Sequence, residues 1–256
     1  MHNYFHSISP LNRYQTSRYS RQPVKTYRAA TSVSKRLLRG LAYFVIALLL
    51  SSIVLTAILR FLPAPTSAFM LHQHIDDLVA GKSYRPIQQH WVSNAQISKY
   101  AFAAVIASED QRFYQHYGFD LDAIYKAYKH NLRGGKLRGA STISQQVAKN
   151  LFLSPARNFG RKILEIWFTL LIETLWDKSR ILEMYLNIAE FGDHLYGIEA
   201  ASRHYFGISA KRLSASQAAL LAATLPNPAA LKADKPTAYL GRRQSWVLRQ
   251  MRNLEP

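Results

Sequence analysis

The chain has 256 residues, with 33 Lys plus Arg against 15 Asp plus Glu, and no cysteine. Without cysteine it can form no disulfide, no thiolate metal site and no cysteine nucleophile. Its formal net charge of +18 predicts an anionic partner, which could be nucleic acid, phospholipid or a phosphorylated substrate.

Residues 1–39 contain eight Lys or Arg and no acid, which predicts a disordered basic tail. Twenty uncharged, mostly apolar residues follow at 40–59. At about 1.5 Å per residue, a helix of this length crosses the hydrocarbon core of a bilayer. We therefore predict a transmembrane helix within residues 40–62. A buried core helix and a cleaved signal peptide are less favoured, because the run is long and no small-residue cleavage site follows closely.

Positive charge is concentrated before this span, whereas only Arg60 follows within the next twenty residues. By the positive-inside rule, the N-terminus lies in the cytoplasm and residues 63–256 form a domain outside it. An exported domain does not meet chromosomal DNA. Its charge therefore favours anionic lipid or a pyrophosphate as partner and argues against nucleic acid.

The exported domain is predicted to be all-α with one hydrophobic core, because helical spacing predominates along it. Ser93 and Gln96 have capping-box spacing and predict the start of a helix that ends at Glu109, and Asp120 can cap residues 121–132. A mobile basic loop is expected at 133–139. Further helices are predicted at 141–153 with Ser141 as cap, 161–175 as a central buried helix, 179–188, 196–206, 218–225 after a capping box at Ser214 and Gln217, and 236–253.

The stretch 108–120 places polar groups at the end of an apolar helix. Glu109 and Asp110 directly follow the apolar run 101–107. A carboxylate at the end of a buried helix is a candidate proton acceptor. The plainer alternative is a charged helix end followed by a solvated loop.

Two later helices carry polar groups at helical spacing. Thr142, Gln145, Gln146 and Lys149 share one face, where amides could bind sugar hydroxyl and acetamido groups and the ammonium could bind phosphate. A solvated helix face is the alternative. The charged group of residues 161–165 opens an apolar helix and is expected to line a cleft, although it could be a simple surface ion pair.

Four groups of residues follow one another in a recognisable order. They are Glu109-Asp110-x-x-Phe113-x-x-His116-x-Gly118-x-Asp120, Gly139-x-Ser141-Thr142-Ile143-x-Gln145-Gln146-x-x-Lys149-Asn150, Arg161-Lys162-x-x-Glu165, and Ile181-Leu182-Glu183-x-Tyr185-Leu186-Asn187. This series resembles the motifs of the peptidoglycan glycosyltransferases, glycosyltransferase family 51. The resemblance covers residues 85–250 and implies a lysozyme-like helical fold with a main lobe and a smaller membrane-proximal lobe.

The resemblance also implies an activity. Lipid II units would be joined by β-1,4 glycosidic bonds with inversion and release of undecaprenyl pyrophosphate, with Glu109 as general base. Glu165 would be the second catalytic carboxylate and arrange the pyrophosphate, directly or through a divalent cation such as Mg or Mn. No tightly bound cofactor is expected, and metal ligands stay unassigned. The implied substrate-binding residues are Ser141, Thr142, Gln145, Gln146, Lys149, Asn150, Arg161 and Lys162.

Other motif residues are expected to have structural roles. For Glu183 the sequence favours a buried acid that braces neighbouring chain. The remaining members of this set are Asp110, Phe113, His116, Gly118, Asp120, Tyr185 and Asn187.

The expected partners are lipid II, the nascent lipid-linked strand and membrane lipids, and other cell-wall synthesis or division proteins could join them. The expected location is the bacterial cytoplasmic membrane, with the catalytic domain on the periplasmic side. Because the chain stops after the match, it resembles the monofunctional members, and no transpeptidase activity is expected. Its Ser-x-x-Lys at 32–35 lies in the basic tail and lacks a Lys-Thr-Gly or Ser-x-Asn partner.

Two other classes of protein stay open. A lytic glycosidase of lysozyme-like fold would also place a Glu at a helix end, but its uncharged substrate needs no cation such as Lys149 beside the acid. A non-catalytic scaffold of the division machinery would share the anchor and the basic surface. Such a scaffold would tolerate the loss of Glu109.

Overall fold

The computed structural model describes residues 28–134, 139–156 and 158–254. The predicted basic tail lies outside the described residues up to position 27, as do residues 135–138 of the predicted basic loop. The chain divides into two compact units, the first ending at Leu49 and the second running from Leu50 to Pro256.

Helix α1, Arg28–Leu59, starts earlier than predicted and takes in the end of the basic segment. The prediction of disorder is therefore wrong for residues 28–39, where Ala, Leu, Lys and Arg are all good helix formers. Within α1 the stretch Ser34–Leu59 is long and apolar enough to cross a membrane. This agrees with the predicted span in kind and extends it toward the N-terminus.

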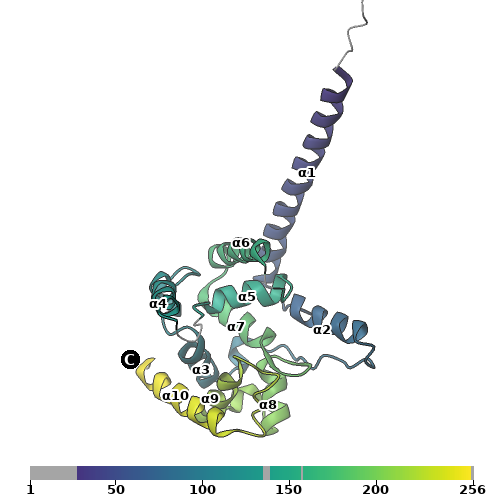
Figure 1. The fold of residues 1–256 in the computed structure, drawn as a ribbon. Coiled ribbons are helices and arrows are strands. Elements are labelled where there is room, and N and C mark those ends of the chain that lie inside the picture. Colours follow the sequence, from purple (N-terminus) through teal and green to yellow (C-terminus); the bar gives the residue numbers. More distant parts are fainter. Residues whose placement is uncertain (1–27, 135–138, 157, 255–256) are drawn as a thin grey trace, which may run out of the picture. The chain divides into compact units, whose positions relative to one another are not determined.

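The second unit is helical apart from one short hairpin, which confirms the all-α prediction (Figure 1). After the last turns of α1, its elements are α2 (Ala68–Val79), η1 (Asn94–Gln96), α3 (Lys99–Glu109), η2 (Phe113–Gln115), α4 (Leu121–Leu132), α5 (Ile143–Phe152), α6 (Phe159–Leu175), α7 (Lys178–Ile188), β1 (Glu190–Gly192), β2 (Leu195–Tyr196), α8 (Ile198–Phe206), η3 (Ala210–Arg212), α9 (Ala215–Thr224) and α10 (Ala238–Leu254).

Capping by side chains determines where most of the helices begin. Asp120 caps α4 as predicted, and the capping box of Ser214 and Gln217 begins α9. The box at Ser93 closes only the 3-10 turn η1, and α3 begins later, after Ser98. Other starts also differ from prediction, because a neighbouring residue supplies the oxygen that accepts the free backbone N–H. Thr142 replaces Ser141 as the cap of α5, Asp177 replaces Ser179 at α7, and α8 begins after Gly197 because Leu195–Tyr196 pairs with β1.

Helix α7 is the central helix of the unit, and the prediction that α6 is buried on most faces is wrong. Every residue of α7 from Ile181 to Ile188 is buried. On α6 the buried side chains are Glu165, Thr169, Ile172 and Glu173. Five of its large apolar residues are exposed, among them Phe159 at 81% and Ile163 at 54%. Hydrophobic periodicity shows that a helix has an apolar face, but it cannot say whether protein covers that face.

Two groups of helices meet at the end of α3. Helix α3 packs on α9 and α10, and α5 packs on α6 and α7 (Figure 1). The last residue of α3 is Glu109, and the first turn of α5 carries the polar side chains predicted to bind sugar. This packing brings the first and second sequence motifs together.

Candidate active site

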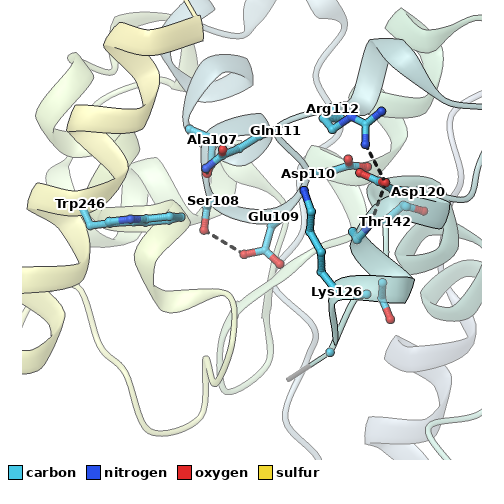
Figure 2. A pocket seen from close by; sticks show the side chains of 14 residues that line it. Ala107, Ser108, Glu109, Asp110, Gln111, Arg112, Asp120, Lys126, Thr142 and Trp246 are labelled. Atoms are coloured by element: carbon cyan, nitrogen blue, oxygen red, sulfur yellow. Dashed lines mark hydrogen bonds and ion pairs between the residues drawn. The ribbon is translucent and has the colours of Figure 1, made fainter. Parts of the chain in front are cut away.

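Glu109 lines a cavity of about 310 Å³ between α3, α4, α5 and α10, hereafter the Glu109 cavity (Figure 2). Its side chain is 14% exposed. The Ser108 hydroxyl donates to Oε1 at 2.9 Å, and the Gln146 amide donates to Oε2 at 3.1 Å. A guanidinium nitrogen of Arg243 lies 3.6 Å from Oε1. Glu109 is thus a fixed, partly accessible carboxylate, as a general base requires.

Asp110 is the buried partner of Glu109 and has a structural part. One of its oxygens lies 2.9 Å from His116 Nε2, and the other accepts from the Ile143 backbone N–H at 3.1 Å. Burial raises the pKa of the Asp110 carboxyl, and the His116 contact opposes this rise. These contacts tie the end of α3 to the start of α5 and so hold Glu109 and Gln146 in register.

The first turn of α5 is built on Gly118. The Thr142 hydroxyl donates to the Gly118 carbonyl at 2.6 Å, and Gln145 accepts from the Thr142 N–H at 3.1 Å. Gly118 has φ of 74°, and a Cβ there would lie 2.7 Å from Thr169 Cγ2. Thr142 and Gln145 were predicted to bind substrate, but both side chains are buried and engaged in capping. Thr142 also lines the Glu109 cavity, and Gln145 lines a second cavity beside Glu165. Their binding of substrate stays a prediction.

A second cavity, also of about 310 Å³, lies next to Glu165 and is hereafter the Glu165 cavity. Glu165 is buried and pairs with Arg161 at 2.7 Å and with Lys162, one on each oxygen. The charges of the third motif line a cleft, as predicted. The residues around this cavity are Phe69, Ser141, Gln145, Gln146, Lys149, Pro155, Arg161, Lys162 and Glu165.

Lys149 is the cation in the Glu165 cavity that has no close acidic partner among the described residues. Its ammonium lies 5.4 Å from the centre of the Phe69 ring. Burial lowers the pKa of Lys149, the neighbouring Arg161 and Lys162 lower it further, and Glu165 opposes them. An anion entering this cavity would favour the charged form of Lys149 and gain a charge-assisted hydrogen bond.

Gln146 and Ser141 connect the two cavities. Ser141 lines both, and Gln146 lines the Glu165 cavity while donating to Glu109. The Tyr185 hydroxyl donates to Gln146 Oε1 at 3.3 Å, which fixes the amide with its nitrogen toward Glu109. Burial first, and then the charges of Glu109 and Asp110, raise the pKa of Tyr185 well above its usual value, so Tyr185 stays a donor.

The fourth motif braces the chain that leads into α3. Glu183 accepts from the Asn94 N–H at 2.8 Å, which fits the structural role favoured from sequence. The Asn187 amide exchanges two hydrogen bonds of 2.9 Å with the backbone of Val92. Phe113 is buried under the Lys178 ammonium, 4.4 Å from its ring centre. These contacts support the site without entering either cavity.

Asn150 was predicted to bind substrate and lies outside both groups of lining residues. Its Oδ1 is buried and meets no donor from the part of the chain that the structure describes. Asn150 follows Lys149 on α5, and its binding of substrate stays a prediction.

A divalent cation finds little support from these side chains. Both oxygens of Glu165 already hold a cationic partner. Across residues 28–134, 139–156 and 158–254, no cluster of three or more His, Asp or Glu could coordinate a metal ion. A cation acting here would need most of its oxygen ligands from the substrate.

Several residues at the Glu109 cavity were missed from sequence. Figure 2 shows Trp246 facing the cavity from α10 and Lys126 from α4, with Arg112 paired to Asp120 at 3.2 Å. Arg243 also reaches the site from α10. The four missed residues lie outside the named positions of the motifs listed above; they are Arg112, Lys126, Arg243 and Trp246. The sequence of α10 indicates only a basic amphipathic helix, so no local signal identifies these residues as part of a site.

The helical fold, the half-buried carboxylate and the adjoining cationic cavity together define a helical glycosyltransferase. The family model described as Transglycosylase matches residues 77–252. The chain is 51% identical over 232 residues to the "Biosynthetic peptidoglycan transglycosylase" of Pasteurella multocida, covering 91% of this chain and 93% of that protein. Proteins of the same name from Aeromonas hydrophila and Haemophilus influenzae are 51% and 54% identical, over 87% and 78% of this chain and 94% and 82% of theirs. The chain belongs to the transglycosylase family.

Proposed function

We propose that this peptidoglycan transglycosylase polymerises lipid II into glycan strands, with Glu109 as general base. One observation carries the proposal: Gln146 joins a fixed carboxylate to a cavity that holds Lys149, Arg161 and Lys162. The reaction needs both a proton acceptor for a sugar hydroxyl and cations for a pyrophosphate leaving group.

In this reaction the acceptor sits in the Glu109 cavity and the donor pyrophosphate in the Glu165 cavity. The 4-hydroxyl of the acceptor GlcNAc attacks C1 of the donor MurNAc, and its proton passes to Glu109. The bond from C1 to undecaprenyl pyrophosphate breaks from the opposite face, so the new β-1,4 link forms with inversion. A general base of this kind contributes roughly 100- to 10,000-fold in rate.

Glu165 acts on the leaving group through its neighbours. Its two ion pairs hold Arg161 and Lys162 toward the cavity, where a like-charged pair would otherwise repel. Lys149 supplies the third charge. We assign Glu165 to positioning these cations, and this assignment needs no divalent ion.

The cationic cavity argues against the lytic glycosidase. That reaction breaks an uncharged glycosidic bond and releases no pyrophosphate, so three cations beside the acid would have no use. A non-catalytic scaffold leaves unexplained why Ser108, Gln146 and Arg243 converge on one accessible carboxylate.

Purified protein incubated with labelled lipid II tests the function. We expect lengthened, uncross-linked glycan strands from lipid II and no fragments from finished cell wall. Because no transpeptidase signature is present, we also expect no covalent labelling by a fluorescent penicillin. Shortened or anhydro products would support the glycosidase instead, and stable penicillin labelling would contradict the absence of transpeptidase activity.

The lipid-linked substrate reaches the enzyme from the membrane, and part of the surface of the second unit is suited to lie against lipid. The Trp176 indole donates to the Thr56 carbonyl at 2.8 Å, and Arg180 donates to the Leu59 carbonyl at 2.7 Å. These bonds fix the last turn of α1 to α6 and α7. The outward apolar face of α6, together with exposed Leu78 and Val79 on α2, provides surface that lipid could cover.

We propose the orientation from charge: basic N-terminus in the cytoplasm, catalytic domain on the periplasmic side. A reporter that is active only outside the cytoplasm, fused after Pro256, is expected to be active. The same reporter fused before Met1 is the control and is expected to be silent. The reverse pattern would overturn this orientation, and with it the access to exported lipid II.

A further inference from the structure

The Ser108 hydroxyl lies between two acceptors. It is 2.9 Å from Glu109 Oε1 and 3.3 Å from the Ala222 carbonyl, near the C-terminal end of α9. A hydroxyl has one hydrogen to donate, so it can serve only one of these acceptors at a time. It also accepts a hydrogen bond from Arg243 at 3.2 Å. Ser108 can therefore turn its hydrogen between two positions without moving its oxygen.

The Arg243 guanidinium also faces Glu109 Oε1. Glu109 is its sole acidic partner among the described residues, with the guanidinium nitrogen 3.6 Å from Oε1. The side chain is 23% exposed, and its Nε is buried with no acceptor in the described parts of the chain. The guanidinium lies 5.9 Å from the centre of the Trp246 ring, which lines the Glu109 cavity. No second carboxylate competes for this charge in that part of the structure.

We propose that Ser108 and Arg243 form a positioning pair that orients the Glu109 carboxylate before proton transfer and accommodates its protonated form afterwards; this rests on the proposed function. With Glu109 charged, Ser108 and Arg243 both face Oε1 and stabilise the negative charge. When the acceptor hydroxyl has given its proton to Glu109, Ser108 turns its hydrogen to Ala222. Its oxygen then accepts a hydrogen bond from the protonated Glu109, and Glu109 later releases this proton to solvent. The pair takes no covalent part in the reaction.

Arg243→Gln tests the electrostatic half of the proposal. The substitution removes a positive charge that lies 3.6 Å from Glu109 Oε1 and keeps a polar side chain in its place. We expect kcat to fall roughly 10-fold with little change in KM or in donor-analogue affinity. Lys keeps the charge, so Arg243→Lys should restore most of kcat.

The matched control is Arg242→Gln, which removes the same charge from the adjacent, exposed position of α10. Its kcat and KM should equal those of the unmodified protein. If Arg243→Gln keeps the kcat of the unmodified protein, the proposal is wrong. If the Gln variant does not fold, Arg243→Lys decides: a folded Lys variant with most of the original kcat supports a role for the charge, and a folded Lys variant with low kcat contradicts it.

Ser108→Ala tests the hydroxyl. It removes the donor to the carboxylate and the acceptor for the protonated acid, so we expect kcat to fall roughly 10-fold or more with little change in KM. Ser108→Thr retains the hydroxyl and should recover most of kcat. Equal activity of the Ala variant and the unmodified protein would exclude the hydroxyl from the mechanism.

These outcomes separate the proposal from the function on which it rests. If the unmodified protein does not polymerise lipid II, the proposed function fails, whatever the variants do. If it polymerises and Glu109→Gln does not, while Ser108→Ala and Arg243→Gln keep normal kcat, the function stands and the positioning pair is refuted.

Discussion

Glu109→Gln should lose roughly 100- to 10,000-fold in polymerisation rate while binding of a donor analogue survives nearly unchanged. The amide keeps the shape of the side chain and can still accept from Ser108, but it cannot take the acceptor's proton. The measurement is the turnover of labelled lipid II by the purified variant. Affinity for moenomycin, a phosphoglycolipid expected to mimic the donor, is measured in parallel.

The matched control for this variant is Asp110→Asn, because Asp110 is the adjacent acid but is tied to His116 and the Ile143 N–H. Since that acid supports structure, its loss should lower stability as well as activity, whereas Glu109→Gln should leave the melting temperature close to the original. Near-normal turnover in Glu109→Gln would contradict the assignment of Glu109 as general base and would favour the non-catalytic scaffold.

Lys149→Ala should weaken moenomycin binding by roughly 10- to 100-fold, which corresponds to the loss of one charge-assisted hydrogen bond of about 1.5–3 kcal/mol. Lys149 has no close acid of its own among the described residues, so its charge is available to a phosphate. Lys235→Ala removes the same charge from an exposed position away from both cavities and should leave affinity unchanged.

The lowered pKa of Lys149 adds a pH dependence to this prediction. Its usual value is 10.5, and burial together with Arg161 and Lys162 brings it down. A lysine with a lowered pKa is charged only up to a correspondingly lower pH, so donor affinity should begin to fall below the range where exposed lysines titrate. Lys149→Arg stays charged and should bind with little change over that range. A flat pH profile in the original protein would contradict a role for the Lys149 charge.

Glu165→Gln distinguishes positioning from metal binding. Losing both ion pairs should free Arg161 and Lys162 and reduce turnover and moenomycin affinity together. If Glu165 acts only through these cations, adding Mg or Mn should change the variant and the original protein by the same factor. If Mg or Mn changes the activity of the original protein alone, Glu165 acts through a divalent cation.

Local sequence determines much of this protein, because many of its signals act within a few residues. A run of twenty uncharged residues predicts a spanning helix whatever the rest of the chain does. Asp120 caps α4 because its carboxylate reaches an N–H three residues along. Spacing alone also placed Arg161, Lys162 and Glu165 on one helix, close enough to pair.

Tertiary structure decided what those local groups meet. Periodicity identified an apolar face on α6 but could not show that protein leaves it uncovered, because burial depends on which elements pack against it. Sequence selected Gln145 and Gln146 equally, yet packing assigned one to capping and the other to Glu109. Ser108 and Arg243 are 135 residues apart, and only the packing of α10 on α3 brings them together. Contacts at such separation leave no spacing in the chain from which they could be predicted.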